Sequence, residues 1–338
     1  MNRTEKATPA FDVKKFFLNN VLIIAMLFMV VVIILIEPAF LQWRVIKDIL
    51  TQSSVKLICA LGLLFPLLLG GTDLSGGRQV GLAAVVVASL SQTSTYVNRF
   101  YPNLPQLPIF LPILLTLFIG AIIGLANGLM ISKLKMAPFI ATYGMSTIVY
   151  GINCLYFSKE PNRSQPIGGI REDLTILSRY KVFGEISLLV PISLGLALLV
   201  WFVLNHTVFG KEMYIVGGNK QAAKVCGINV DRVTVTAFMI ESTLVALAGI
   251  LEVARTGGAN SAYGNAYEFD AISSAVVGGV SLSGGIGKVS GVLIGVVIFT
   301  IISYGLAFIG LNPNWQLIIK GLIIVCAVAL DMQKNSSN

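Results

Sequence analysis

The feature that most constrains this 338-residue chain is a series of about ten apolar runs, each close to the ~20 residues that cross a bilayer as a helix. Charged residues make up only 12% of the chain, against roughly 25% in soluble domains. The mean hydropathy is +0.83. These properties exclude a soluble enzyme, a disulfide-rich secreted scaffold and a disordered chain. We expect an all-α polytopic membrane protein.

The expected spans differ in regularity. They are 17–36, 54–71, 80–97, 109–132, 137–157, 186–204, 233–254, 271–284, 289–310 and 314–331. The third ends in Ser, Thr and Gln, and the eighth is short and rich in glycine. Irregular backbone survives at membrane depth only beside protein or water, so we expect short or broken helices at these two places.

The topology follows from an even number of spans, which puts both termini on one side of the membrane. Lys and Arg favour a cytoplasmic location for segment 1–20 and for loop 205–232. Glu37-Pro38 follows the first apolar run where a signal peptide would have a small-residue cleavage site, so this run is expected to remain as a span. We predict a single transmembrane domain over 1–338 in the cytoplasmic membrane, with both termini cytoplasmic.

The charged, cysteine and histidine side chains give little support for other classes of protein. The net charge is +8, but the basic residues form no long run, so they indicate topology and contact with lipid headgroups, not nucleic-acid binding. Cys59, Cys154, Cys226 and Cys326 form no CxxC pair and are expected to be small buried hydrophobes without a metal. His206 is the only histidine, so no Ser-His-Asp or Cys-His hydrolase is expected.

A similar eight-residue motif occurs in each half of the chain. The sequence GGTDLSGG at 70–77 recurs as GGVSLSGG at 278–285, and each copy lies between two apolar runs. Many transporters are built from duplicated halves, with the substrate path near the repeat interface. We expect an internal duplication, whose parallel or inverted sense the sequence leaves open.

The sequence LSGGRQ at 74–79 looks like a signature of ATP-binding-cassette ATPases. That signature binds γ-phosphate only together with a P-loop, and no GxxxxGK[ST] sequence is present. Both glycine-rich copies also adjoin apolar spans. We therefore expect no ATP hydrolysis by this chain, no enzymatic activity and no cofactor.

Glycines at four-residue spacing predict close helix packing. The two sets are Gly120, Gly124 and Gly128 in one expected span, and Gly291 and Gly295 in another. Small residues on one face let neighbouring backbones approach each other in a membrane.

Loop 205–232 carries a short predicted helix. Gly217-Gly218 interrupts the chain, and Asn219 is placed to cap the helix that follows. Residues 220–226 are good helix formers, and Gly227 can supply the left-handed residue that ends the helix. The alternative interpretation is that this helix has only a structural role, as an ordinary connection between two spans.

The spacing Gln-Ala-Ala-x-x-x-Gly at 221–227 resembles the EAA-x-x-x-G coupling loop of ABC importer permeases, which docks into an ATPase subunit. Two lysines four residues apart share one face of the helix and can meet acidic partners. Gln stands here in place of the acidic residue of the general pattern. The predicted coupling residues are Asn219, Lys220, Gln221, Ala222, Ala223, Lys224 and Gly227.

The resemblance extends over almost the whole chain to the monosaccharide permeases of ABC importers. It is carried by GTDLSGGRQVGLAA at 71–84, PFI at 138–140, IVYGIN at 148–153, GGN at 217–219 and NPxWQxIIKG at 312–321. The likeness is weakest in segments 1–50 and 158–185. The resemblance implies a homodimeric permease, a tandem-domain ABC ATPase, a periplasmic sugar-binding protein, and import of galactose, a methyl galactoside or a related sugar.

Ionisable and polar groups inside the spans are candidates for a translocation pathway, because each charge costs at least ~2–3 kcal/mol at a helix centre. The candidates are Asp73, Arg78, Glu241, Asn127 and Asn153. Arg78 can pair with Asp73, and Glu241 can equally form a structural hydrogen bond between helices. The alternative function is a secondary transporter or channel, driven by an ion gradient through Glu241 and Asp73.

Lys320 is the other charge in a predicted span. It lies five residues after Trp315, roughly 7–8 Å along a helix. A long lysine side chain can reach back to the membrane surface over that distance. We expect this in preference to a role in substrate binding.

Overall fold

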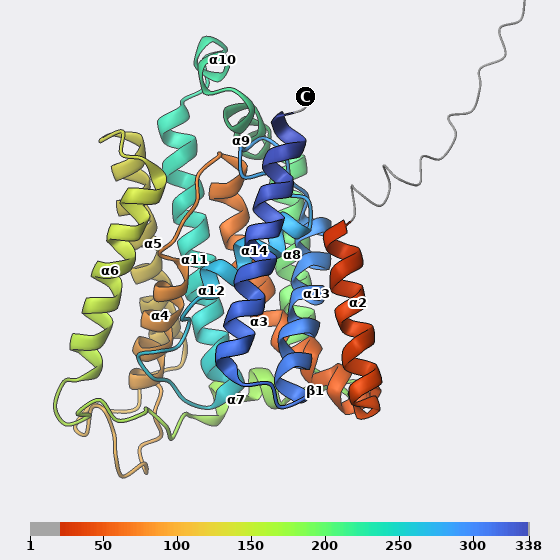
Figure 1. Ribbon diagram of the computed structural model, residues 1–338. Coiled ribbons are helices and arrows are strands. Elements are labelled where there is room, and N and C mark those ends of the chain that lie inside the picture. Colours follow the sequence, from red (N-terminus) through yellow and green to blue (C-terminus); the bar gives the residue numbers. More distant parts are fainter. Residues whose placement is uncertain (1–20, 337–338) are drawn as a thin grey trace, which may run out of the picture.

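The computed structural model describes residues 21–336 as a bundle of helices with one small hairpin of two short strands (Figure 1). The elements are α2 (Val21–Ile36), η1 (Pro38–Leu41), α3 (Trp43–Leu68), α4 (Gly76–Leu90), α5 (Phe110–Ser132), α6 (Pro138–Phe157), α7 (Glu172–Arg179), β1 (Lys181–Val182), β2 (Ile186–Ser187), α8 (Leu189–His206), α9 (Val208–Gly218), α10 (Lys220–Val225), α11 (Val230–Thr256), α12 (Tyr267–Val277), α13 (Val289–Phe308) and α14 (Pro313–Ser336).

The bundle has two distinct ends. The short helix α10 lies at one end, together with the start of α2 and the end of α14 (Figure 1). The hairpin β1–β2 and helix α7 lie at the opposite end. We call these the α10 end and the β1 end. The two ends of the described chain therefore lie on the side that carries loop 205–232, whereas the cytoplasmic segment predicted over 1–20 lies outside the described residues.

Each of the ten predicted spans overlaps one helix of the bundle. By length and composition, five helices within residues 21–336 can cross a membrane: α3, α5, α8, α11 and α13. Apolar stretches in α2, α4 and α14 are shorter. The structure thus supports a polytopic, mostly helical membrane protein without confirming ten full-length transmembrane helices.

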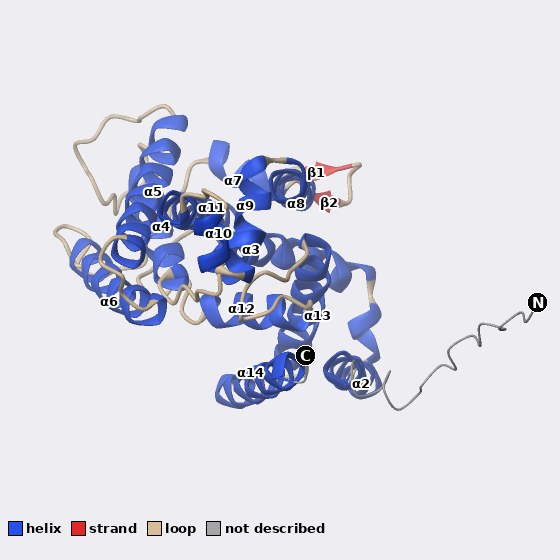
Figure 2. Ribbon diagram, turned by 90° about the horizontal axis from the view of Figure 1, so that it is seen from above, coloured by secondary structure: helices blue, strands red, loops and turns tan. Residues whose placement is uncertain are grey.

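Helix α11 lies at the centre and packs against α3, α4 and α5 (Figure 2). The glycines of α5 make its contact with α11 close. A Cβ added to Gly120 would lie 2.7 Å from the Ala246 Cβ, and one added to Gly128 would lie 2.7 Å from the Val235 Cα. A Cβ on Gly124 would lie 2.8 Å from the Met239 Cα. Only glycine lets the two backbones approach this closely.

Helix α4 covers only about half the depth of the bundle. Segment 69–75 runs from the α10 end toward the middle without helical hydrogen bonding. Helix α4 then begins at Gly76, beside Glu241 near the middle of α11, and continues to the β1 end. The third predicted span is therefore a short helix, as expected, but the interruption lies before it at 69–75, in the glycine motif, whereas its polar residues after Leu90 follow the end of α4.

Helix α12 is the counterpart of α4 in the other half of the bundle. Segment 257–266 starts at the β1 end, where Ala259 forms a β-bridge with Ile167. It runs along α4, and a Cβ on Gly264 would lie 2.8 Å from the Val80 Cβ. Helix α12 then continues to the α10 end. Helix α12 has 11 residues and covers only 271–277 of the eighth predicted span, because glycines end the helix at Gly278.

The first turns of these two half-helices meet in the interior. The carboxyl of Glu268, in the first turn of α12, lies against Gly77 in the first turn of α4. A Cβ on Gly77 would lie 2.9 Å from the Glu268 Cδ. The two N-termini therefore face each other at mid-depth, with the positive ends of both helix dipoles directed to one region.

The two copies of the glycine motif also lie together, at the α10 end. A Cβ on Gly70 would lie 2.9 Å from the Ser283 carbonyl oxygen. Each copy follows a helix that runs toward the α10 end and precedes one that runs away from it. The helices that flank the two copies therefore have the same orientation, whereas the half-helices α4 and α12 run in opposite directions.

The packing of α5 on α11 gives a direct test. Replacing Gly124→Ala forces a methyl group against Met239 and Ser242, and overpacking of this kind costs about 1–3 kcal/mol. We expect a lower thermal unfolding midpoint for the detergent-solubilised variant. Gly151→Ala on α6 is the control, because its added Cβ meets nothing within 4 Å. Equal midpoints for the two variants would contradict this account of the packing.

Candidate functional site

The middle of the bundle holds a buried polar cluster at the start of α4. Asp73 is completely buried, and its Oδ1 accepts hydrogen bonds of 2.6 Å from both the backbone N–H and the hydroxyl of Ser75. Asn127 on α5 donates to the Asp73 Oδ2 over 3.1 Å and to the Ser75 hydroxyl over 3.0 Å. The cluster ties segment 69–75 to α5, which gives this irregular backbone partners at membrane depth.

Glu241 lies beside the same cluster. It is completely buried, and its Oε2 accepts a 2.7 Å hydrogen bond from the Ser242 hydroxyl. Its Oε1 has no hydrogen-bond partner among the described atoms, and it would lie 3.5 Å from a Cβ on Gly76. The structure therefore brings Asp73, Asn127 and Glu241 into one region.

Arg78 does not pair with Asp73. Its guanidinium lies over the ring of Tyr150 on α6, with 4.2 Å between the guanidinium carbon and the ring centroid. Asn153, one turn further along α6, donates to the Ser261 carbonyl oxygen over 3.3 Å. These two residues connect α6 to α4 and to segment 257–266, on the opposite side of the half-helices from α3.

A charged triad that the sequence analysis missed joins three helices. Asp270 in the first turn of α12 pairs with Lys56 on α3 over 3.2 Å and with Lys320 on α14 over 2.9 Å. The side chains are mostly buried, with 12%, 10% and 21% of Lys56, Asp270 and Lys320 exposed. Lys320 therefore binds a carboxylate inside the bundle instead of reaching back to the surface as predicted.

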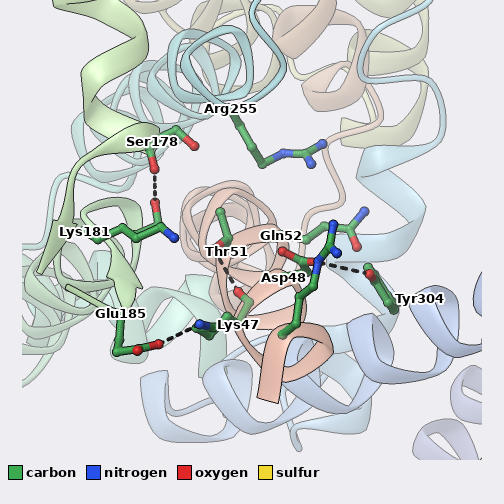
Figure 3. A pocket seen from close by; sticks show the side chains of 11 residues that line it. Lys47, Asp48, Thr51, Gln52, Ser178, Lys181, Glu185, Arg255 and Tyr304 are labelled. Carbon is green, nitrogen blue, oxygen red and sulfur yellow. Dashed lines mark hydrogen bonds and ion pairs between the residues drawn. The ribbon is translucent and has the colours of Figure 1, made fainter. Parts of the chain in front are cut away.

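A polar cavity of about 690 Å³ opens at the β1 end (Figure 3). Four cations and two carboxylates face it, together with hydroxyl and amide groups. The lining residues are Arg44, Lys47, Asp48, Thr51, Gln52, Ser178, Lys181, Glu185, Ser187, Arg255 and Tyr304. None of the five predicted pathway residues is among them. The cavity has the size and polarity of a site for a small polar ligand.

Ion pairs and hydrogen bonds hold the wall of this cavity. Lys47 on α3 pairs with Glu185 of the hairpin over 2.6 Å, and the Tyr304 hydroxyl lies 3.5 Å from Asp48 (Figure 3). The hydrogen bond from Lys47 lowers the pKa of Glu185 below its usual range. Arg44, Asp48 and Gln52 recur every four residues along one face of α3, a pattern that could have indicated this wall from the sequence.

The predicted cap and end of the short helix α10 are both present. The Asn219 side chain accepts hydrogen bonds from the backbone N–H groups of Gln221 and Ala222, over 2.9 and 3.0 Å. Gly227 has φ +80° and ends the helix in the left-handed conformation. Helix α10 therefore forms a defined projection at the α10 end (Figure 1).

One predicted coupling residue does not face outward. Ala223 is completely buried and belongs to the main hydrophobic core. Helix α10 therefore packs on the bundle through this residue. The exposed positions include Lys220, Gln221, Ala222, Lys224 and Gly227. Val225 is 89% exposed, an apolar side chain at the tip of the projection that the sequence analysis did not select.

The remaining features singled out in the sequence are the glycines of α13, the cysteines and possible metal ligands. A Cβ added to either Gly291 or Gly295 of α13 would collide with backbone atoms of α12 or its C-cap. All four cysteines are free, but only Cys59 is buried as expected; Cys226 and Cys326 are exposed. Over residues 21–336, no group of three His, Cys, Asp or Glu side chains is arranged to hold a metal ion.

Comparisons with known proteins show which family the chain matches. The family described as "Branched-chain amino acid transport system / permease component" matches residues 45–328. A galactose/methyl galactoside import permease protein of Haemophilus influenzae is 46% identical over 99% of this chain and 98% of its own length. The protein of that name from Escherichia coli is 45% identical over 92% of this chain and 93% of its own length.

A ribose import permease protein of Haemophilus influenzae is 33% identical over 96% of both chains. No solved structure matches the chain. The helical bundle and these similarities together define a membrane permease of a transport system. The chain belongs to the permease-component family that matches residues 45–328.

The charged triad gives a test of how the half-helix α12 is held. Replacing Asp270→Asn leaves Lys56 and Lys320 as two buried cations without their carboxylate. Removing one partner of a buried ion pair costs about 3–5 kcal/mol, so we expect a markedly lower unfolding midpoint. Adding Lys320→Met to Asp270→Asn should recover part of the loss, because one unpaired charge is removed. An unchanged midpoint for Asp270→Asn would show that the triad does not stabilise α12.

Proposed function

We propose that this chain is the permease subunit of an ABC importer that carries galactose, a methyl galactoside or a related monosaccharide into the cytoplasm. The observation that carries the proposal is the identity of 46% over 99% of the chain to a galactose/methyl galactoside import permease protein. Relatedness to ribose import permeases supports a monosaccharide as the substrate class. The helical bundle supports a multi-pass protein of the inner membrane.

The proposal includes partners and an orientation. ATP hydrolysis takes place in a separate tandem-domain ATPase, and a periplasmic sugar-binding protein delivers the sugar. Two copies of this chain form the working permease. The α10 end faces the cytoplasm, so both termini and loop 205–232 lie on the ATPase side. The β1 end, with its polar cavity and the hairpin, faces the periplasm.

Helix α10 is proposed as the contact with the ATPase. It projects from the bundle, its tip exposes apolar Val225, and its two lysines offer positive charge to an acidic groove. Buried Ala223 fixes the helix on the bundle, so a force applied to α10 reaches the core. The docking surface consists of Lys220, Gln221, Ala222, Lys224 and Val225, with Asn219 and Gly227 shaping its two ends.

Val225→Asp tests this contact. A carboxylate at the apolar tip should remove the ATPase from the complex, so that it no longer copurifies with the tagged chain and ATP-driven sugar uptake falls at least tenfold. The control is Val208→Asp on α9, where the side chain is 72% exposed but lies outside the proposed docking surface. Copurification of the ATPase in native amount with Val225→Asp would overturn the assignment of α10.

The two carboxyl groups of the ion-gradient alternative lie within reach of each other in the bundle interior. Asp73 is bound by Ser75 and Asn127, and Glu241 is bound by Ser242. Such bonds satisfy polar groups that hold irregular backbone within a membrane bundle. The family relationship favours ATP-driven import, so the cluster is proposed to line the pathway and support the half-helices without carrying protons.

The cavity at the β1 end is proposed to receive the sugar from the binding protein. Its volume of about 690 Å³ exceeds that of one monosaccharide, and its hydroxyl, amide and charged groups suit a polyhydroxyl ligand. Gln52 lies deeper along α3 than Arg44 and Asp48, toward the buried triad at Lys56. A sugar in the cavity would therefore lie between the periplasmic surface and the half-helices.

Gln52→Leu tests the cavity. Loss of one neutral hydrogen-bonding group costs about 0.5–1.5 kcal/mol, which corresponds to a roughly 2- to 10-fold lower initial rate of uptake at limiting sugar. Gln42→Leu is the control, since Gln42 precedes the same helix but does not line the cavity. Rates would be measured in proteoliposomes that contain the complete importer. Equal rates for the two variants would remove the cavity from the sugar path.

A further inference from the structure

Three segments that are far apart in the sequence meet through glycine backbone at the α10 end. They are the end of α3 with Gly70, the end of α9 with Gly217, and the turn between α12 and α13 with Gly284 and Gly285. Gly285 N–H donates a 2.8 Å hydrogen bond to the Leu68 carbonyl oxygen, which joins the third segment to the first. We call Gly70, Gly217, Gly284 and Gly285 the glycine junction.

The junction leaves no room for side chains. A Cβ on Gly217 would collide with the Leu68 carbonyl oxygen and lie 2.7 Å from the Gly285 nitrogen. A Cβ on Gly284 would lie 2.6 Å from the Gly70 nitrogen and 2.9 Å from the Gly217 carbonyl oxygen. Each of the three segments thus touches the other two through backbone atoms.

The conformation of the junction also requires glycine. Gly70, Gly284 and Gly285 have φ of +69°, +89° and +72°, a region that residues with a side chain rarely adopt. Backbone in direct contact cannot yield by changing rotamers, as packed side chains can. A displacement of one segment is therefore passed to the other two with little loss.

A second contact runs beside the junction. The Tyr214 hydroxyl on α9 donates a 2.8 Å hydrogen bond to the carbonyl oxygen of Gly287, two residues after the junction. The same two segments are thus joined twice, once through backbone and once through a side chain. Both contacts lie in the last two turns of α9, directly before α10.

The three segments lead to the parts of the permease that must be coupled. Gly217 lies two residues before Asn219, the cap of α10. Gly70 lies at the start of segment 69–75, which leads to α4, and Gly284 follows α12 by seven residues. The first turns of α4 and α12 face each other at mid-depth, where Glu268 lies against Gly77.

We propose that the glycine junction is the element that transmits movement of α10 to both half-helices, so that the contact between the first turns of α4 and α12 opens when the ATPase moves α10. This inference rests on the proposed function, in which α10 is the contact with the ATPase. It identifies Gly217 and its neighbours as positioning residues, which bind neither sugar nor ATPase.

The test compares Gly217→Ala with Gly218→Ala, in proteoliposomes that contain the permease, the ATPase and the binding protein. Gly218 is the matched control, because a Cβ added there meets nothing within 4 Å. The readouts are ATPase copurification, ATP hydrolysis and sugar taken up per ATP. We expect Gly217→Ala to keep the ATPase and its hydrolysis but to lose at least tenfold in uptake per ATP. Gly218→Ala should match the native protein.

Tyr214→Phe keeps the inference testable if Gly217→Ala fails to fold. It removes one hydroxyl, so we expect a native unfolding midpoint and a severalfold lower uptake per ATP. Native uptake per ATP in a folded Gly217→Ala complex, or loss of its ATPase, would overturn the inference. If Gly217→Ala does not fold, native uptake per ATP in Tyr214→Phe would overturn the inference instead. Failure of the native chain to bind an ATPase or import sugar would instead overturn the proposed function.

Discussion

The fold depends on one constraint, which is that backbone polar groups at membrane depth must find partners inside the protein. Helices α4 and α12 both begin in the middle of the bundle, and each is preceded by non-helical backbone. The central helix α11 and its neighbours α3 and α5 surround these interruptions. Asp73 and Asn127 then supply hydrogen bonds that a continuous helix would not need. The buried polar residues are therefore required by the broken helices.

The same interruptions give the bundle a place where its conformation can change. A continuous transmembrane helix moves as one rod, whereas two half-helices that meet end to end can separate without breaking internal hydrogen bonds. The charged triad around Asp270 fixes α12 to α3 and α14, and the glycine contacts of α5 fix the opposite side. In this account the outer helices form a frame, and the half-helices form the element that responds to the ATPase.

The sequence predicted the parts of this structure that depend on local pattern. Apolar length located the helices, irregular composition marked α4 and α12, and the cap at Asn219 followed from residue type alone. The triad could not be predicted, because Lys56 and Asp270 are 214 residues apart and only the packing of helices brings them together. The burial of Ala223 was missed for a similar reason: the orientation of a six-residue helix depends on the core beneath it.

The most direct measurement of the central claim is double electron–electron resonance between spin labels in the assembled importer, with and without ATP. Labels at Val208→Cys and Ile286→Cys report on α9 and the turn after the glycine junction, and a label at Phe183→Cys marks the β1 end; all three positions are exposed. Native cysteines would be replaced. The account predicts a constant Val208–Ile286 distance and a changed Ile286–Phe183 distance when ATP binds. A changed Val208–Ile286 distance with a constant Ile286–Phe183 distance would contradict it.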